Sequence, residues 1–297
     1  MSKPSSKRFL ITGATGSTGS LVAQELLRLG ETVRCMTRDA TKAARLTDAG
    51  AEVIVGDLDR PETLNAAFAG VDSAYLVTPT GPNTVPQAMN GIRAAKDAGV
   101  RYLVRYSILD IPEMENVRSS RFHKEVEAAL SDSGLDYCIL RSTNYMQGLL
   151  AAAPTIQSDS AIYMPWGDGR VGMIDVRDIA ESVVEVLTGG GHQGNTYSVT
   201  GPKAITLHEA ASAISDAIGK QVSYVDIPEE AAKQGLEAMG LDAWTAEEYM
   251  SFFAAFKSNY ASLVTDGVER LTGHAPHTIN EFARDYAGMF AGEAVAC

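Results

Sequence analysis

Three glycines near the start of the chain have the spacing of a turn that binds the phosphates of a nucleotide. Gly13, Gly16 and Gly19 follow the apolar run 9–11 and precede a helical pattern that begins near Ser20. Gly13 would allow a tight turn, Gly16 would let the backbone approach a pyrophosphate, and Gly19 would let the helix pack against the strand. The helix N-terminus would then hold the phosphates; an ordinary strand-to-helix turn is the alternative. The polar residues expected to complete the cofactor contacts of this turn are Thr15, Ser17 and Thr18.

The end of the second expected strand indicates which dinucleotide is bound. An NAD-selective domain usually places an acidic side chain there, where it accepts hydrogen bonds from the ribose hydroxyls. This chain has Arg38 instead, whose guanidinium would pair with the 2′-phosphate of NADP, and Lys42 adds charge one helical turn further on. Asp39 is expected to cap the following helix. We therefore predict NADP (NADPH) as the cofactor, with a solvated Arg38 as the alternative.

Two further strand ends are expected to border the cofactor. Asp57 and Leu58 follow the third strand, where Asp57 would approach the adenine edge or, alternatively, cap a helix before Pro61. Thr78 and Pro79 follow the fourth strand, and ligands of such sheets bind where the strand order reverses. This rule gives a location for Thr78 and Pro79 and assigns them no chemical role.

Strand-like and helical segments alternate along the first half of the chain, as a parallel, doubly wound α/β sheet requires. The strand-like segments are 9–11, 32–37, 52–55, 74–77, 102–106 and 137–140, and helical patterns cover 41–49, 62–68 and 85–98. We expect residues 1–150 to form an NADP-binding domain to which 171–197 return. Residues 151–170 and 198–297 would form a smaller, interleaved substrate-binding lobe.

The expected lobe contains a capping box, Thr206 with Glu209, that starts a helix, and a strand follows at 222–225. An aromatic stripe further on would pack the lobe core or line the pocket of a flat substrate. Its members are Trp244, Tyr249, Met250, Phe252, Phe253 and Phe256.

The composition indicates which partners are disfavoured and which cellular compartment is favoured. The 297 residues carry 25 basic and 37 acidic side chains, and a net charge of −12 works against binding the phosphates of nucleic acids. Cys35, Cys138 and Cys297 form no Cys-x-x-Cys pair, which favours the reducing cytoplasm. The N-terminal apolar run of about four residues is too short for a signal peptide or a membrane helix. We expect no metal at His274 and His277, no membrane partner, and a possible homodimer.

Several motifs together resemble those of the NmrA-like atypical short-chain dehydrogenases. They are TGATGSTG at 12–19, TRD at 37–39, GDL at 56–58, GL at 134–135, LR at 140–141, IDVRD at 174–178 and YSVTGP at 197–202. The resemblance implies a Rossmann domain that binds NADP and a small C-terminal lobe that closes over a substrate cleft. Members of this group reduce quinones, azo or triphenylmethane dyes, or plant phenolic ethers and isoflavones, whereas one is a dinucleotide-sensing regulator without evident turnover.

The wider superfamily uses a serine at the end of the fifth strand and a tyrosine four residues before a lysine on the next helix. The lysine and the cofactor ribose lower the pKa of the tyrosine, so its hydroxyl exchanges a proton with the substrate carbonyl. Ser107 and Lys124 occupy two of these positions, but Ser120 stands where the tyrosine would be. A serine hydroxyl lacks that acidity. The substitution favours acceptors that need little acid assistance, such as quinones, iminium ions or extended conjugated systems.

Other side chains near these positions are candidates for the chemistry. Lys124 would anchor the nicotinamide ribose or donate a proton, or else lie solvated. His123 titrates in a useful range and is a candidate proton donor, although it points about 100° away from Lys124 on a helix. Tyr145 would contact the substrate or nicotinamide, or pack at the lobe junction. Tyr106 points to the sheet face opposite Ser107 and is expected in the core.

Two functions remain open from these residues. The first is an NADPH-dependent oxidoreductase that reduces a small aromatic, quinone-like or imine/enone-like acceptor, supported by Ser107, Lys124 and the apolar lobe. The second is an NmrA-type NADP-sensing regulatory protein without turnover, supported by the missing tyrosine. One fold hosts many functions, so an isomerase or other tailoring reaction also stays open.

Overall fold

The computed structural model describes residues 7–293, which form two compact units. The first unit comprises the chain up to Leu109 together with Ser119–Ser142 and Ile179–Ser198. The second comprises Asp110–Arg118, Thr143–Asp178 and the chain from Val199 onward. The chain therefore passes between the units repeatedly.

The segment 171–178, expected to return to the first domain, is grouped with the second unit. Its backbone explains the grouping, because Val171 pairs with Ile205 and Ile174 with Tyr145 through isolated bridges. All four residues belong to the second unit. The return to the first unit begins at Ile179, within the helix that follows.

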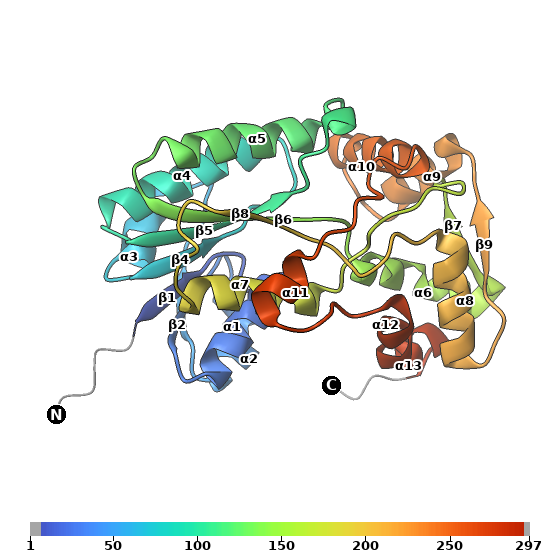
Figure 1. Cartoon of the computed structure of the whole chain (residues 1–297), viewed down its shortest axis with the longest axis horizontal. Helices are drawn as coiled ribbons and strands as arrows, with labels where there is room; N and C mark the ends of the chain where they lie inside the picture. Colours follow the sequence, from blue (N-terminus) through green and yellow to red (C-terminus); the bar gives the residue numbers. More distant parts are fainter. Residues whose placement is uncertain (1–6, 294–297) are drawn as a thin grey trace. The chain divides into compact units, whose positions relative to one another are not determined.

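The first unit is built on a seven-stranded sheet in the order β3-β2-β1-β4-β5-β6-β8 (Figure 1). Its strands are β1 (Arg8–Ile11), β2 (Thr32–Thr37), β3 (Glu52–Val55), β4 (Ser73–Leu76), β5 (Tyr102–Ile108), β6 (Asp136–Ser142) and β8 (Thr196–Val199). Neighbouring strands from β1 to β6 pair in parallel. The direction of winding reverses between β1 and β4, so the expected doubly wound Rossmann sheet is confirmed.

Helices cover both faces of this sheet. They are α1 (Gly19–Arg28), α2 (Ala44–Asp48), α3 (Leu64–Phe68), α4 (Thr84–Asp97), α5 (Arg118–Ser131) and α7 (Val176–Thr188), with short 3₁₀ turns η1 (Ala40–Ala43) and η2 (Pro61–Thr63). In Figure 1, α3, α4 and α5 lie along one face, and α1 and α7 along the other. An apolar cluster joins strands and helices of the first face, among them Leu10, Phe68, Ile92, Leu103 and Leu130. This core fixes the strand ends that carry the candidate site.

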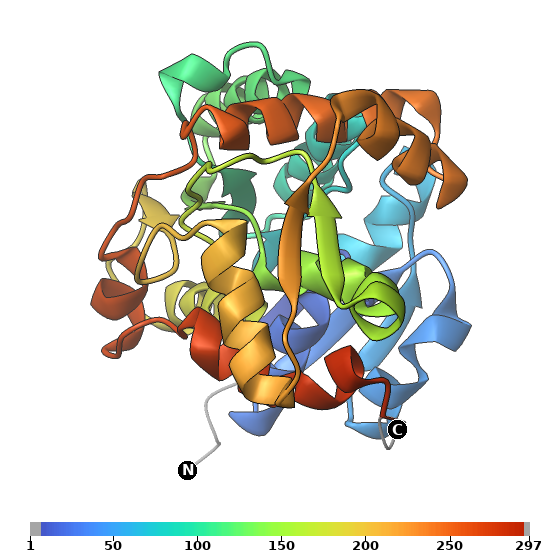
Figure 2. The same ribbon diagram turned by 90° about the vertical axis from the view of Figure 1, so that its right-hand side faces the viewer.

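The second unit contains a two-stranded parallel sheet of β7 (Ala161–Met164) and β9 (Ser223–Asp226) (Figure 2). Its helices are η3 (Pro112–Met114), η4 (Met146–Ala152), α6 (Ala153–Asp159), α8 (Leu207–Ile218), α9 (Glu229–Ala238), α10 (Ala243–Lys257), α11 (Gly267–Thr272), α12 (Ile279–Asp285) and α13 (Ala287–Ala291). The predicted capping box is confirmed, because Thr206 and Glu209 bond reciprocally at the start of α8. Within the described range 7–293, none of the helices is both long and apolar enough to span a bilayer.

The aromatic stripe on α10 contributes mainly to the core of the second unit. Phe253 and Phe256 are buried, and their ring centroids lie 6.0 and 4.7 Å from that of Trp166. Tyr249, by contrast, is 44% exposed. The Trp244 ring lies 5.0 Å from the guanidinium carbon of Arg118, a cation–π contact.

Candidate functional site

The glycine turn (residues 12–19) presents its backbone to the surface. Gly13 and Gly16 are exposed, whereas Gly19 is buried. Gly13 has φ of +58°, and a Cβ there would lie 2.7 Å from Val77 Cγ1. A Cβ on Gly19 would lie 2.3 Å from the carbonyl oxygen of Gly13. The turn therefore needs glycine at its bend and where α1 packs. Gly16 is exposed between them, with its amide bonded to the Gly13 carbonyl at 2.9 Å.

No side chain caps the N-terminus of α1. Its N-cap residue, Thr18, makes no capping hydrogen bond through its side chain. The Thr18 hydroxyl instead lies 3.2 Å from Tyr75 Oη in the interior. Thr15 and Ser17 are exposed, so they are the polar side chains of the turn available to a cofactor. Uncapped amides at a helix start provide partners for phosphate.

A single hydroxyl ties the glycine turn to the neighbouring strand. Thr12 Oγ1 donates toward the carbonyl oxygens of Tyr75 and Val77, both at 3.1 Å, and accepts from the Val77 amide at 2.9 Å. Thr12 is completely buried. The ends of β1 and β4, where the strand order reverses, are thus held together without a ligand.

Arg38 and Lys42 are both exposed after β2. Arg38 makes no ion pair with any residue in the described part of the chain. Asp39 accepts from the Thr41 amide at 3.0 Å, which confirms it as a helix cap. An exposed guanidinium held beside a capped turn is suited to pair with a phosphate.

The other residues expected to contact the cofactor differ in how far their side chains are buried. Asp57 is half-buried and its Oδ1 accepts from the Asp59 amide at 3.0 Å, while the Leu58 side chain lies in the core. Thr78 is buried and accepts from Arg105 Nη2 at 3.0 Å, and Pro79 is exposed. Leu58 and Thr78 would therefore meet a cofactor through their backbones.

A chain of hydrogen bonds surrounds Ser107 at the end of β5. Ser107 is completely buried, and its Oγ donates to Glu127 Oε1 at 2.5 Å and lies 3.2 Å from His123 Nδ1. Arg141, on β6, donates its Nε to Glu127 Oε1 at 3.0 Å and its Nη2 to Glu127 Oε2. Three elements, β5, α5 and β6, thus fix the hydroxyl of Ser107.

Arg105 adds a buried positive charge on the same face of β5 as Ser107. Its guanidinium donates to the Leu76 carbonyl at 3.1 Å as well as to Thr78. Burial lowers the pKa of Arg105 to about 10. Burial, together with the charge of Arg105, holds the pKa of His123 well below its usual value. His123 is therefore a neutral imidazole near pH 7.

Two of the three positions that the wider superfamily uses for catalysis, Ser120 and Lys124, lie on α5, and the third, Ser107, lies on β5. Ser120 and His123 are buried, and Lys124 beside them is half-buried. Tyr106 is buried and bonds Ser142 on β6, as expected for a core residue. The first unit thus brings Lys124 and His123 onto one helix, with Ser107 bonded to the latter.

The sequence was compared with models of known protein families, and the model of the NmrA-like family matches residues 5–283. The chain belongs to the NmrA-like family. The resemblance inferred from the motifs is confirmed.

Three proteins similar to this NmrA-like chain match over almost their full lengths. The NAD(P)H azoreductase of Xenophilus azovorans is 37% identical over 281 residues, which are 95% of this chain and 98% of the azoreductase. The NADPH-dependent quinone oxidoreductase of Escherichia coli, complexed with NADPH, has a TM-score of 0.83 at 28% identity and covers 93% of this chain and 99% of its own. The triphenylmethane reductase of Citrobacter sp., complexed with NADP(H), has a TM-score of 0.82 at 27% identity, with coverages of 95% and 99%.

Tyr145 lies in the second unit of the NmrA-like chain. It is half-buried and precedes η4 as its N-cap residue. Its backbone bridges that of Ile174. This position fixes the backbone of Tyr145 inside the second unit.

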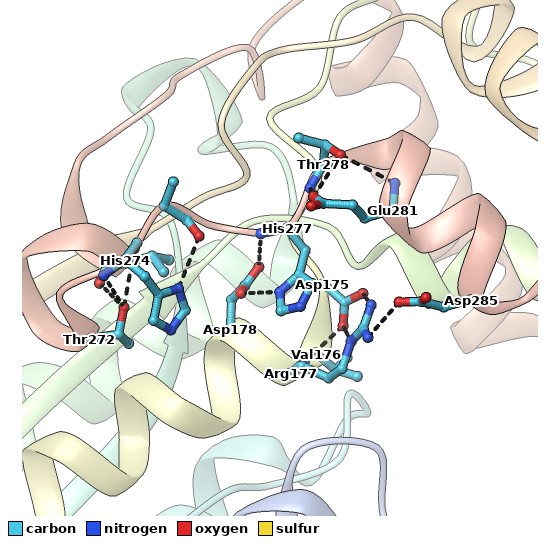
Figure 3. Close-up of polar contacts among 12 residues, drawn as sticks. Asp175, Val176, Arg177, Asp178, Thr272, His274, His277, Thr278, Glu281 and Asp285 are labelled. Atoms are coloured by element: carbon cyan, nitrogen blue, oxygen red, sulfur yellow. Dashed lines mark hydrogen bonds and ion pairs between the residues drawn. The ribbon is translucent and has the colours of Figure 1, made fainter.

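A polar cluster in the second unit joins the start of α7 to the segment before α12 (Figure 3). Asp178, in the first turn of α7, accepts from the His277 amide at 2.9 Å and from its Nδ1 at 2.6 Å. The fold brings this carboxylate to His277 from 99 residues away in the sequence. Burial raises the pKa of Asp178, against the opposing effect of His277. Within residues 7–293 no group of three or more His, Cys, Asp or Glu side chains could hold a metal ion.

The same cluster contains an arginine bound to two carboxylates. Arg177 Nη2 lies 2.8 Å from Asp175 Oδ2, and its Nη1 lies 2.7 Å from Asp285 Oδ2 on α12. Burial opposes ionisation of Asp175, but the hydrogen bonds from Arg177 and Gln147 lower its pKa overall. These contacts attach α12 to the start of α7.

Sequence reasoning missed Glu127, Arg105 and Arg141 in the NmrA-like chain. Glu127 stands four residues after His123, so helical spacing places both on one face of α5. Arg105 stands two residues before Ser107, so strand alternation places both on one face of β5. These spacings were a usable signal. The contact of Arg141 with Glu127 depends on the β5–β6 register, which sequence spacing does not reveal.

Proposed function

We propose that this chain is an NADPH-dependent reductase that passes hydride to a small aromatic, quinone-like or imine/enone-like acceptor. The observation that carries the proposal is the exposed glycine turn at an uncapped α1 N-terminus. It occurs in a chain that matches an azoreductase, a quinone oxidoreductase and a triphenylmethane reductase over nearly its full length. The chain is accordingly an NAD(P)H-dependent reductase of the atypical short-chain dehydrogenase type.

The residues of the first unit fit a dinucleotide. The amides of the glycine turn and α1 would hold the pyrophosphate, and Arg38 with Lys42 would hold the 2′-phosphate. Asp57 would lie toward the adenine, and the backbone at Thr78 and Pro79 would border the nicotinamide half. When bound, NADPH supplies the hydride. The protein supplies position and electrostatics.

Proton donation to the acceptor has less help from protein side chains here than in tyrosine-dependent dehydrogenases. Ser120 is buried where the tyrosine would stand, and its hydroxyl is a poor acid. Lys124 would orient the nicotinamide ribose and hold a proton at its Nζ. Such a site is suited to acceptors whose reduced form is stabilised by conjugation, so that little acid catalysis is needed.

We assign cofactor binding to the first unit and contacts to the acceptor to the second, including Tyr145 and exposed aromatic residues such as Tyr249. We also propose a cytoplasmic location. Cys35 and Cys138 are buried free thiols, which fits a reducing compartment.

The test is oxidation of NADPH, followed by its absorbance, against quinones, azo dyes, enones and cyclic imines. Turnover that is lost in Gly16→Val and strongly reduced in Lys124→Met supports the reductase and identifies its acceptor class. Tight NADPH binding without reduction of any acceptor would instead favour the NADP-sensing regulator. The presence of Ser120 in place of the catalytic tyrosine is the observation that supports this second function.

A further inference from the structure

The hydrogen bonds around Ser107 have a defined direction. Arg141 has only donors and contacts both oxygens of Glu127. The Glu127 carboxylate therefore accepts, and it accepts the single hydroxyl proton of Ser107 at 2.5 Å. Ser107 has no second proton to give. Toward His123, 3.2 Å away, it serves only as an acceptor.

This direction determines which nitrogen of His123 carries a proton. Because Ser107 accepts from Nδ1, that nitrogen must be the protonated one. The charged groups around the ring are Arg105 on β5, Glu127 on α5 and Arg141 on β6. Glu127 is neutralised by Arg141, whereas Arg105 bonds neutral oxygens and so opposes a second positive charge. A neutral ring with its proton on Nδ1 has an unprotonated Nε2.

The remaining nitrogen is left for a ligand. None of the residues in the described part of the chain makes a hydrogen bond to His123 Nε2. His123 retains 7% exposure, next to the half-buried Lys124. Nε2 is not among the fully buried polar atoms of the described residues that lack a partner, so it is accessible to a ligand. As an acceptor, it favours a group that donates a hydrogen bond.

We propose that His123 is a positioning residue that offers Nε2 as a hydrogen-bond acceptor to an N–H or O–H group of the bound ligand and supplies no proton. Carboxamide N–H, hydroquinone O–H and hydrazine N–H groups share this chemistry. The statement about a ligand rests on the proposed function, whereas the protonation state of the ring stands on the geometry of the free protein. In a two-electron reduction the hydride comes from NADPH. The accompanying proton comes from Lys124 or from water.

The first experiment is independent of activity. In protein labelled with ¹⁵N-histidine, long-range ¹H–¹⁵N spectra distinguish protonated from unprotonated ring nitrogens, and His123→Gln identifies the His123 signals. We expect a protonated Nδ1 and an unprotonated Nε2, unchanged across the ordinary histidine pKa of about 6.5. A protonated Nε2 in the free protein at neutral pH overturns the proposal.

Two serine variants test whether the chain of hydrogen bonds sets this state. Ser107→Ala removes the acceptor of Nδ1, and we expect the proton to move to Nε2. Ser142→Ala is the matched control, because it removes a buried hydroxyl that bonds Tyr106 on the neighbouring strand. An unchanged His123 spectrum in a folded Ser107→Ala variant contradicts the assigned role of Ser107. If that variant fails to fold, the wild-type spectrum still decides the tautomer.

Kinetics then separate a hydrogen-bond acceptor from a proton donor. Loss of one neutral hydrogen bond in His123→Phe is expected to lower kcat/KM about three- to tenfold without changing the shape of its pH profile. Disappearance of an ionisation from that profile would identify His123 as the proton donor and overturn the proposal. If no acceptor is reduced by the wild type, the proposed function fails, while the spectra still test the ring.

Discussion

The imidazole of His277 and the carboxylate of Asp178 form a 2.6 Å contact that fastens the segment before α12 to the first turn of α7. His277→Ala would remove the ring hydrogen bond from the completely buried carboxylate and keep the bond from the backbone amide of residue 277. We expect the free energy of unfolding to fall by about 1–3 kcal/mol. Urea denaturation measures this. His274→Ala is the control, and it is expected to lose less stability because His274 is exposed and its ring bonds the adjacent Ala275 carbonyl.

Arg38→Ala should weaken NADPH binding far more than NADH binding, by about 1.5–3 kcal/mol for a lost charged hydrogen bond. The reason is that the 2′-phosphate is the chemical difference between the two cofactors. Titration calorimetry with each cofactor measures it. Arg45→Ala, which removes a charge from exposed α2 nearby, is the control. Equal losses for both cofactors would show that Arg38 has no role at the phosphate.

Gly16→Val and Gly19→Val should fail in different ways. A Cβ at Gly16 would be 3.2 Å from the Gly13 carbonyl oxygen, a tight contact that a shift of a few tenths of an ångström relieves, so we expect the free protein to fold and lose cofactor binding. At Gly19 the corresponding distance is 2.3 Å, so the turn itself should be disrupted. Circular dichroism and cofactor titration on both variants distinguish the two effects. Normal NADPH affinity in Gly16→Val would show that this glycine does not face the pyrophosphate.

Lys124→Met should lower turnover about 10- to 100-fold, as expected for the loss of a charged hydrogen bond to ribose or substrate. Thermal unfolding should be nearly unchanged, because the side chain is half-buried and methionine preserves its apolar stem. Lys96→Met, at an exposed position of α4, is the matched control. Kinetics indistinguishable from wild type would mean that Lys124 is an ordinary surface lysine.

Glu209 predicts a pH dependence of stability in the second unit. The hydrogen bond from Lys203 is the largest cause that lowers its pKa, to about 2 from 4.5. Its stabilising effect should therefore be fully present above pH 4.5 and lost as the pH falls toward about 2. The difference in Tm between wild type and Glu209→Gln should shrink over that interval. A difference that stays constant with pH would contradict the assignment.

Local patterns predicted most of the first unit. Thr32–Thr37 and Glu52–Val55 are strands with the expected bounds, because each is a short apolar run between turn residues. β7 was missed because four residues carry little periodicity and its partner, β9, lies about sixty residues further along the chain. The expected return of 171–176 to the main sheet relied on its apolar composition, whereas the pairing of Val171 with Ile205 draws it to the second unit.

The placement of candidate site residues was predictable where it depends on backbone shape or on position relative to a strand end, whereas their roles stay predictions. The exposed glycine turn and Arg38 are examples. Partnerships between distant side chains were not predictable from one sequence. Asp178 with His277 and Glu127 with Arg141 are brought together by tertiary packing, which leaves no local spacing to detect.

The Thr12 hydroxyl bonds both the carbonyl oxygen and the amide of Val77. This affects how tightly a dinucleotide would be held. A loop that orders only on contact with its ligand loses conformational entropy at that moment, which weakens the observed affinity. Here the loop is already clamped in shape, so association would leave the backbone of the turn largely unchanged. The measured dissociation constant would then report the phosphate and ribose contacts themselves. Thr12→Val would weaken binding by making the glycine turn more mobile, although the Thr12 side chain does not contact the ligand.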